Sequence, residues 1–207
     1  MEYPKKCNEK RIFHINVIPG AWCYGRYQKV GNDSKTPAVT FGGNYQTGDI
    51  VLRNGKGFIS DLFRNTSKRE KKYSHAGIIV IENNKPYVYH MLGNPGGGGE
   101  FKKETLSGFC NPASNKGFGI YRFNFLQNKE NEFNSWLQHV IQMKPKFDGD
   151  FNLEESGNMY CTELIYNMCE TVSAVHLEGT TVNERIYIGL DDLYLNKYTT
   201  NITHLNY

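Results

Sequence analysis

The chain has 207 residues, of which 39% are hydrophobic and 22% are charged, and its formal net charge is +3. This length and composition are those of one soluble globular domain, and they exclude a disordered or fibrous chain. The net charge is too small to indicate nucleic acid as a partner, and no window approaches the roughly 18 apolar residues that a membrane-spanning helix needs.

The first 125 residues of the chain predict mainly strands. The segment before Thr47 is rich in glycine and indicates loops, and a short helix is expected over 57–64. Two of the predicted strands are joined by a hairpin turn near 83–85. Strands are expected from alternating or β-branched apolar residues over 48–54, 75–82, 86–92 and 118–125.

Two helices are expected in the second half. Over 132–143 the apolar residues recur at i, i+3, i+4, i+7 and i+8, which buries one stripe of a helix. A second helix begins at Cys161. Its apolar positions repeat with the same spacing at Cys161, Leu164, Ile165, Met168, Cys169 and Val172. Because strands precede helices along the chain, we expect an α+β fold with an antiparallel sheet.

Cys161 stands where free backbone N–H groups and the helix dipole favour an anion and lower the pKa of a thiol. The position therefore suits a nucleophile, and the same N–H groups could hold a developing oxyanion. It also suits a thiol that fills the core, because cysteine is among the most buried residue types. Position alone does not decide between the two roles.

A nucleophilic thiol needs a base that is itself held by a third group, and histidine is the usual base. His75 and His90 lie on the two strands of the predicted hairpin, so they meet if their side chains share a face. One imidazole would then accept the thiol proton while the other fixes its tautomer. The other four histidines are interpreted as structural or surface residues.

A cysteine with two histidines is also compatible with a transition metal. No carboxylate or second cysteine stands at a recognisable ligand spacing, and the five cysteines include no C-x-x-C pair. A metal site therefore stays a minor alternative, and we expect no metal and no organic cofactor.

The most basic run of the chain is S-K-R-E-K-K at residues 67–72. A solvated loop is the simpler interpretation of this run. The sharper interpretation, which rests on its closeness to His75, is an edge of the site that attracts anionic substrates.

Together these features resemble the NlpC-type cysteine peptidase superfamily, in the circularly permuted papain-like branch that includes YiiX-like proteins. The matching segments are G-D-I-V-L-R (48–53), Y-S-H-A-G-I-I-V (73–80), Y-V-Y-H (87–90), K-P-K-F-D-G-D-F (144–151) and M-Y-C-T-E-L-I-Y (159–166). The resemblance implies an α+β permuted papain-like fold, in which an antiparallel barrel-like sheet packs against a helix carrying the cysteine. We expect the thiol hydrolase domain over 47–207, and over 1–46 an extension or cap that is part of the same unit.

The resemblance also implies roles for single residues. Cys161 corresponds to the nucleophile, His75 to the base and His90 to the third polar residue. Tyr160 and Ser74, which precede the cysteine and the base histidine, are expected to bind substrate. His90 stands where some permuted members have glutamate, and Thr162 stands where serine is common.

The expected activity is that of a cysteine hydrolase that cleaves amide bonds, in cell-wall peptides or related substrates, through an acyl-thioester intermediate. Two alternatives stay open: a thiol acyltransferase or hydrolase on acyl lipids, and a lipid-binding module without turnover. The expected partner is a peptide or an acyl-lipid substrate. The N-terminus has no apolar stretch like that of a signal peptide, while the resemblance favours the bacterial cell envelope or secretion.

Overall fold

The computed structural model describes residues 41, 44–94, 97–153, 157–182 and 185–207. The strands of this described part are β1 (Ile50–Gly55), β2 (His75–Glu82), β3 (Lys85–Gly93), β4 (Gly99–Thr105), β5 (Asn115–Phe123), β6 (Lys146–Phe147), β7 (Asn158–Met159), β8 (Thr180–Val182), β9 (Arg185–Tyr187) and β10 (Thr199–Asn206). Its helices are α1 (Phe58–Arg64), α2 (Leu106–Phe109), α3 (Glu130–Met143) and α4 (Cys161–Ser173), with short 3-10 helices at Asn124–Leu126 and Asp191–Leu193. The extension predicted over 1–46 lies almost wholly outside the described residues.

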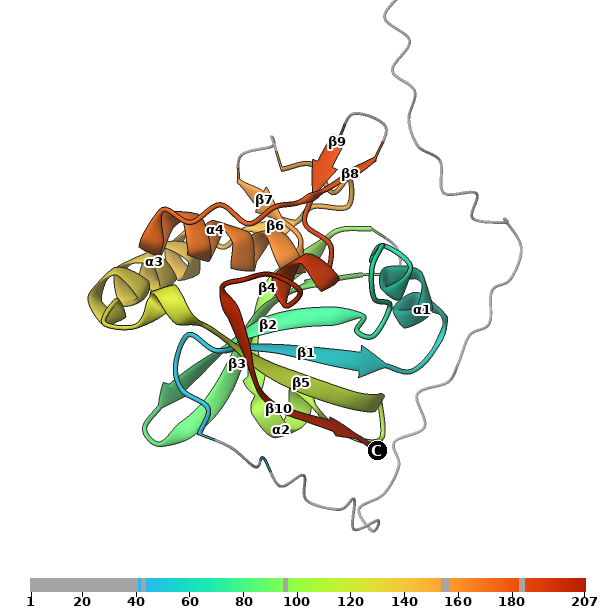
Figure 1. Ribbon diagram of the computed structural model, residues 1–207, viewed down its shortest axis with the longest axis horizontal. Coiled ribbons are helices and arrows are strands. Elements are labelled where there is room, and N and C mark those ends of the chain that lie inside the picture. Colours follow the sequence, from blue (N-terminus) through green and yellow to red (C-terminus); the bar gives the residue numbers. More distant parts are fainter. Residues whose placement is uncertain (1–40, 42–43, 95–96, 154–156, 183–184) are drawn as a thin grey trace, which may run out of the picture. The chain divides into compact units, whose positions relative to one another are not determined.

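Eight strands form one sheet in the order β10-β5-β1-β2-β3-β4-β6-β7 (Figure 1). Among the described residues its pairings are antiparallel, except that β6 and β7 run parallel. Strands β8 and β9 form a separate antiparallel hairpin. The prediction of an α+β fold with an antiparallel, barrel-like sheet is confirmed.

The four strands expected from the sequence correspond to β1, β2, β3 and β5, and β2 has the predicted bounds. The turn between β2 and β3 explains why this hairpin was visible in the sequence. Asn83 and Asn84 have φ angles of 49° and 60°. Two successive positive φ angles are the requirement of a type I′ turn, and asparagine tolerates them better than most residues.

One face of the sheet is covered by α3 and α4, which lie beside each other in Figure 1. This face holds the larger of two clusters of buried apolar residues. The stripe predicted for α4 is buried at every position, and each fully buried aliphatic side chain contributes about 1.5–3 kcal/mol to stability. Apolar burial on this face therefore fixes the helix that carries Cys161 against strands β2 and β3.

The opposite face of the same strands carries the second cluster, which α2 completes. Val51 and Leu52 belong to different clusters, because successive residues of a strand point to opposite faces. Thr105 caps the four-residue helix α2 by accepting a hydrogen bond from the N–H of Gly108. This short helix places Phe109, which is fully buried, against the ends of β1, β2 and β3.

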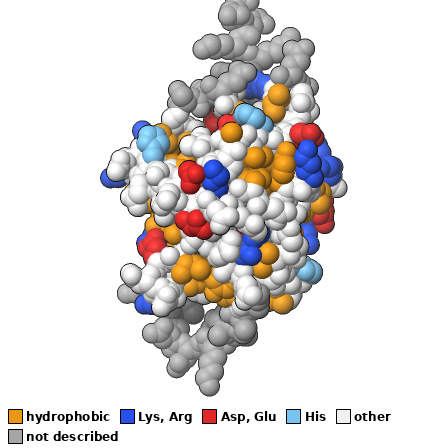
Figure 2. All heavy atoms as spheres, turned by 60° about the vertical axis from the view of Figure 1, so that its left-hand side comes forward, with side chains coloured by type: hydrophobic (Ala, Val, Ile, Leu, Met, Phe, Trp, Pro, Cys, Tyr) orange, Lys and Arg blue, Asp and Glu red, His pale blue; other side chains and the backbone are white. Residues whose placement is uncertain are grey.

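Figure 2 shows one face of the molecule, on which acidic, basic and hydrophobic side chains are interspersed. Charge on this face therefore does not mark a surface for a strongly charged partner. Within the described ranges, no helix is long and apolar enough to cross a membrane.

Candidate active site

Helix α4 begins at Cys161, as predicted, directly after a residue with extended backbone. Tyr160 has φ −96° and ψ 173°, and its backbone N–H donates a hydrogen bond to Oε2 of Glu163 at 3.2 Å. This contact is one half of a capping box and holds the chain where the helix starts. Because Cys161 is the first helical residue, its side chain lies beside N–H groups that have no acceptor inside the helix.

The surroundings of the Cys161 thiol act on its pKa in opposite directions. The residue is 4% exposed, and burial raises the pKa of the thiol to about 11. Backbone N–H groups of Ala76, Thr162 and Cys161 itself lower the pKa, as does the guanidinium of Arg53. The expectation that the helix N-terminus lowers the thiol pKa is thus right in direction but outweighed by burial. The neutral thiol must give its proton to a base in order to attack.

His75 opens β2, His90 lies on the neighbouring strand β3, and their imidazoles are in contact. Nε2 of His75 lies 2.8 Å from Nδ1 of His90, with the rings nearly perpendicular. Gly77 makes room for this contact, because a Cβ atom there would lie 2.4 Å from Cγ1 of Val88 and 3.1 Å from Cβ of His90. The two histidines that the sequence singled out therefore lie together, on the same face of the sheet.

A carboxylate that the sequence did not predict lies behind the histidine pair. Oε1 of Glu104, on β4, is 2.9 Å from Nε2 of His90. The two atoms are within hydrogen-bond distance, although Nε2 has no aligned partner among the described residues. Burial raises the pKa of Glu104, but His90, Arg53 and Lys102 together outweigh burial and lower it. Glu104 is therefore ionised at neutral pH.

These contacts indicate which nitrogen of each imidazole carries its proton in the series His75–His90–Glu104, which we call the His–His–Glu row. An ionised carboxylate beside Nε2 of His90 favours the proton on that nitrogen, so Nδ1 of His90 is an acceptor. Nε2 of His75 then carries the proton that it donates to His90. Nδ1 of His75 is left as the basic atom of the pair.

Both histidines are neutral at neutral pH. Burial is the largest cause that holds the pKa of His75 well below its ordinary value, and Arg53 and His90 act in the same direction. Burial also lowers the pKa of His90, although Glu104 opposes it. His75 is therefore free to accept a proton.

We expect the protein to lose stability as the pH falls below about 6.5, the ordinary pKa of histidine. Because the pKa of both histidines is lower in the folded protein, the unfolded chain binds protons at His75 and His90 more readily in this range, so acid favours unfolding. Each histidine adds a slope of at most about 1.4 kcal/mol per pH unit. Urea unfolding between about pH 7.5 and pH 5 measures this slope. His90→Gln should reduce this slope.

Phe109 supports the site from the side of α2. Its ring centroid lies 5.6 Å from that of His75, 5.3 Å from that of His90, and 4.4 Å from Cζ of Arg53. Arg53 is the residue of β1 directly opposite His75. One buried aromatic ring thus holds both imidazoles and a guanidinium.

Ser74 and Tyr160, which were predicted to bind substrate, have structural partners. Oγ of Ser74 accepts a hydrogen bond from the N–H of Gly55 at 2.8 Å and donates to the carbonyl of Arg53 at 3.2 Å. The hydroxyl of Tyr160 accepts a hydrogen bond from the N–H of Ile188 at 2.9 Å. Both residues are buried and brace the backbone beside the site, and their binding of substrate stays a prediction.

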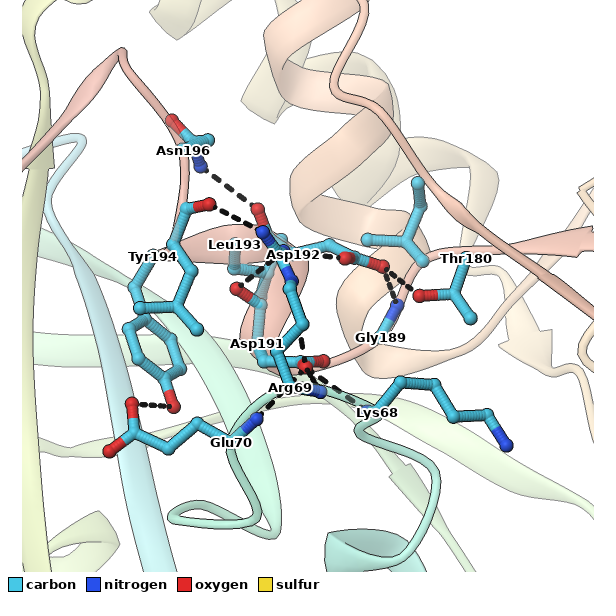
Figure 3. A network of polar contacts seen from close by, with 12 residues as sticks. Lys68, Arg69, Glu70, Thr180, Gly189, Asp191, Asp192, Leu193, Tyr194 and Asn196 are labelled. Carbon is cyan, nitrogen blue, oxygen red and sulfur yellow. Dashed lines mark hydrogen bonds and ion pairs between the residues drawn. The ribbon is translucent and has the colours of Figure 1, made fainter.

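The basic run S-K-R-E-K-K is bound to the protein's own carboxylates (Figure 3). Oδ2 of Asp191 accepts hydrogen bonds from the backbone N–H groups of Lys68, Arg69 and Glu70, at 3.1, 2.6 and 3.3 Å. The guanidinium of Arg69 donates to Oδ1 of Asp192 at 2.8 Å. These contacts do not support the run as a site for anionic substrates, because its N–H groups already hold an anion.

A cleft of about 800 Å³ lies between α3 and α4, with Trp136 and Val140 among the residues that line it. Neither Cys161 nor His75 lines this cleft. We place the candidate site at the cysteine, because no cysteine of the described residues lines the cleft, whereas the residues around Cys161 include an imidazole pair and a carboxylate.

Comparisons with known proteins bear on the fold and the activity. The profile of the family described as permuted papain-like amidase enzyme, YaeF/YiiX, C92 family, matches residues 44–193. The crystal structure of the metalloprotein yiiX from Escherichia coli O157:H7 has a similar fold, with a TM-score of 0.61 at 15% sequence identity. That likeness covers 78% of this chain and 98% of that chain. No curated protein gives a significant match.

Proposed function

The chain belongs to the permuted papain-like amidase family, a family of cysteine hydrolases acting on amides, and we propose that Cys161 is its nucleophile and attacks peptide bonds to form an acyl-thioester. One observation carries this proposal. The thiol at the start of α4 lies beside the N–H of Ala76, and the residue before Ala76 is His75, which heads the His–His–Glu row. The closeness of the thiol to the start of β2, and the action of the Arg53 guanidinium on both Cys161 and His75, support these two residues as nucleophile and base.

The reaction begins with transfer of the thiol proton to Nδ1 of His75. The sulfur then attacks the amide carbonyl, and the backbone N–H groups at the start of α4 stabilise the oxyanion that forms. The C–N bond breaks as His75 returns the proton to the leaving amine. Water, deprotonated by His75, hydrolyses the thioester and restores the thiol. His90 and Glu104 hold His75 in the tautomer that each proton transfer needs.

A metal-dependent reaction does not fit the donor atoms of this site, although the structurally similar yiiX is described as a metalloprotein. Nε2 of His75 and Nδ1 of His90 face each other, and Glu104 lies beside the remaining nitrogen of His90. Within the described residues, no three histidine, cysteine or carboxylate side chains group as metal ligands. Stoichiometric zinc in the purified protein would contradict the nucleophilic role of Cys161.

The proposed substrate class is that of cell-wall peptides and related amides, which would place the protein in the bacterial envelope. A substrate panel tests this proposal: muropeptides, unrelated peptides and acyl lipids, each incubated with the wild type and with Cys161→Ala. Release of an amine that depends on Cys161 is the expected result. Turnover of acyl lipids alone would replace the proposed substrate with a lipid.

We expect Glu104→Gln to lower kcat about 100-fold with little change in KM. The neutral amide no longer stabilises the protonated histidine pair, and its NH₂ group can reverse the tautomer of His90. Because Glu104 raises the pKa of His90, its loss should also move the acid limb of the kcat/KM profile to lower pH.

Two variants control for a structural effect at Glu104. Glu104→Asp keeps the charge and should restore part of the activity. Glu100→Gln, at an exposed position on the same strand, should leave kcat unchanged. An acid limb that does not move in Glu104→Gln would show that the carboxylate has no electrostatic role in the reaction.

A further inference from the structure

Arg53 brings a positive charge to the cysteine. It lies on β1 opposite His75, and the next residue of β2, Ala76, directs its backbone N–H toward the sulfur of Cys161. The guanidinium is close enough to both Cys161 and His75 to affect their ionisation. Neither the proton transfers nor the covalent step described above uses this charge.

The contacts of Arg53 leave one edge of its guanidinium open. Nη1 donates a hydrogen bond to the carbonyl of Phe109 at 3.3 Å and lies 3.9 Å from Oε1 of Glu104. Nε and Nη2 have no hydrogen-bond partner among the described residues. The side chain is 21% exposed, so its two free donors are not sealed in the core. Stacking on Phe109 fixes the plane in which these donors lie.

Nε and Nη2 form the side edge of a guanidinium, which matches the two oxygens of a carboxylate. The balance of charge around the site also favours an anion. In the described part of the chain, two cations act on the carboxylate of Glu104: Arg53, and Lys102, whose backbone is paired with His90. A substrate carboxylate would pair with the charge that Glu104 leaves uncompensated.

We propose that Arg53 binds a carboxylate of the substrate beside the scissile bond, so that this enzyme selects amides next to a free carboxyl group. The inference rests on the proposed role of Cys161 as nucleophile and adds the substrate class. The sequence indicated the basic run of residues 67–72 as the part that attracts an anion, but Asp191 already occupies the backbone N–H groups of this run. We assign the binding of the anion to Arg53 instead.

Two alkylating reagents of almost equal size test the proposal without knowledge of the natural substrate. In both, the sulfur of Cys161 forms a bond to carbon and iodide leaves, but iodoacetate carries a carboxylate where iodoacetamide carries a neutral amide. The rate of each is measured at Cys161 by peptide mass mapping of the full chain. The ratio of the iodoacetate rate to the iodoacetamide rate is then compared with the same ratio for N-acetylcysteine at the same pH and salt.

The wild type should exceed the N-acetylcysteine ratio by about tenfold or more, because a charge-assisted pair to a guanidinium is strong in a partly buried site. Arg53→Gln should return the ratio to that of N-acetylcysteine. Arg53→Lys should give an intermediate value, since lysine keeps the positive charge but lacks the two parallel N–H donors of the guanidinium. Arg185→Gln, at an exposed position on β9, should keep the wild-type ratio. Thermal melting of each variant verifies folding.

Three results would overturn the proposal: no preference for iodoacetate in the wild type, equal slowing of both reagents in Arg53→Gln, or no reaction of Cys161 with either reagent. Equal slowing would mean that Arg53 acts on the thiol and not on the carboxylate. If neither reagent reacted with Cys161, the thiol would be inaccessible, and no substrate bound at the thiol could place a carboxylate on Arg53. The proposed function is tested by a separate measurement. If Cys161→Ala retained amide turnover, the proposed function would be wrong, but the alkylation ratio measured on the wild type would not change.

Discussion

Replacing Cys161 with alanine should reduce amide hydrolysis by about 10⁴-fold or more, because the proposed acyl intermediate forms on the sulfur of this residue. The variant should still fold, since the first position of α4 accepts alanine and the stripe beyond it stays intact. The measurement is single-turnover release of amine from a substrate identified in the panel, with denaturant unfolding of the same preparation.

Cys169 provides the matched control on the same helix. It lies two turns further along the buried stripe and is fully buried, and burial raises the pKa of its thiol well above the ordinary value. Cys169→Ala should cost about 1 kcal/mol of stability through the small cavity it leaves, and it should keep the wild-type turnover. Turnover lost in Cys169→Ala but kept in Cys161→Ala would show that the chemistry belongs to Cys169.

Gly77→Ala should disrupt both the fold and the site. The added methyl group would lie 2.4 Å from Cγ1 of Val88 and 3.1 Å from the backbone carbonyl of Tyr89, so β3 has to move away from β2. Overpacking of this kind costs about 1–3 kcal/mol. The same shift carries His90 away from His75, so we expect kcat to fall more than stability alone explains. Urea unfolding and kcat on the same preparation separate the two effects.

Gly149→Ala is the control for this substitution, because a Cβ atom at Gly149 meets nothing within 4 Å. Its effect on stability should stay within about 0.5 kcal/mol, as for other surface changes. If Gly77→Ala were as stable and as active as Gly149→Ala, the close approach of β2 and β3 would not be needed to pair the histidines.

Local patterns explain why much of the fold could be predicted from the sequence. The stripe of α4 and the turn at Asn83 and Asn84 depend on residues a few positions apart, so the signal lies in short windows. Strand β4 gave no such signal, because all seven of its residues are partly or fully exposed and its apolar pattern is weak. The alternation of Phe101, Lys103 and Thr105 with Glu100, Lys102 and Glu104 was the available indication of a strand. Missing β4 meant missing Glu104.

Contacts between distant residues decided the rest of the candidate site. The opposition of Arg53 and His75 depends on the register of β1 and β2. Asp191 binds the backbone of Arg69 although the two residues are 122 positions apart. The sequence alone could not show this partner, so the basic run was interpreted as a solvated loop or as an edge that attracts anions. The thiol pKa likewise depends on how completely the folded chain buries Cys161, a quantity that no helix N-terminus reveals.

The sequence by itself determined the helix that opens with Cys161, the hairpin that carries His75 and His90, and the family resemblance that the profile match confirmed. These features follow from periodicity, turn chemistry and short motifs, which are properties of neighbouring residues. Only the tertiary structure showed that Glu104 lies against the histidine pair and that Arg53 brings an open cation to the cysteine. Strand register and burial set the distances and the local dielectric on which their proposed roles depend, and both arise only when segments far apart in the chain pack together.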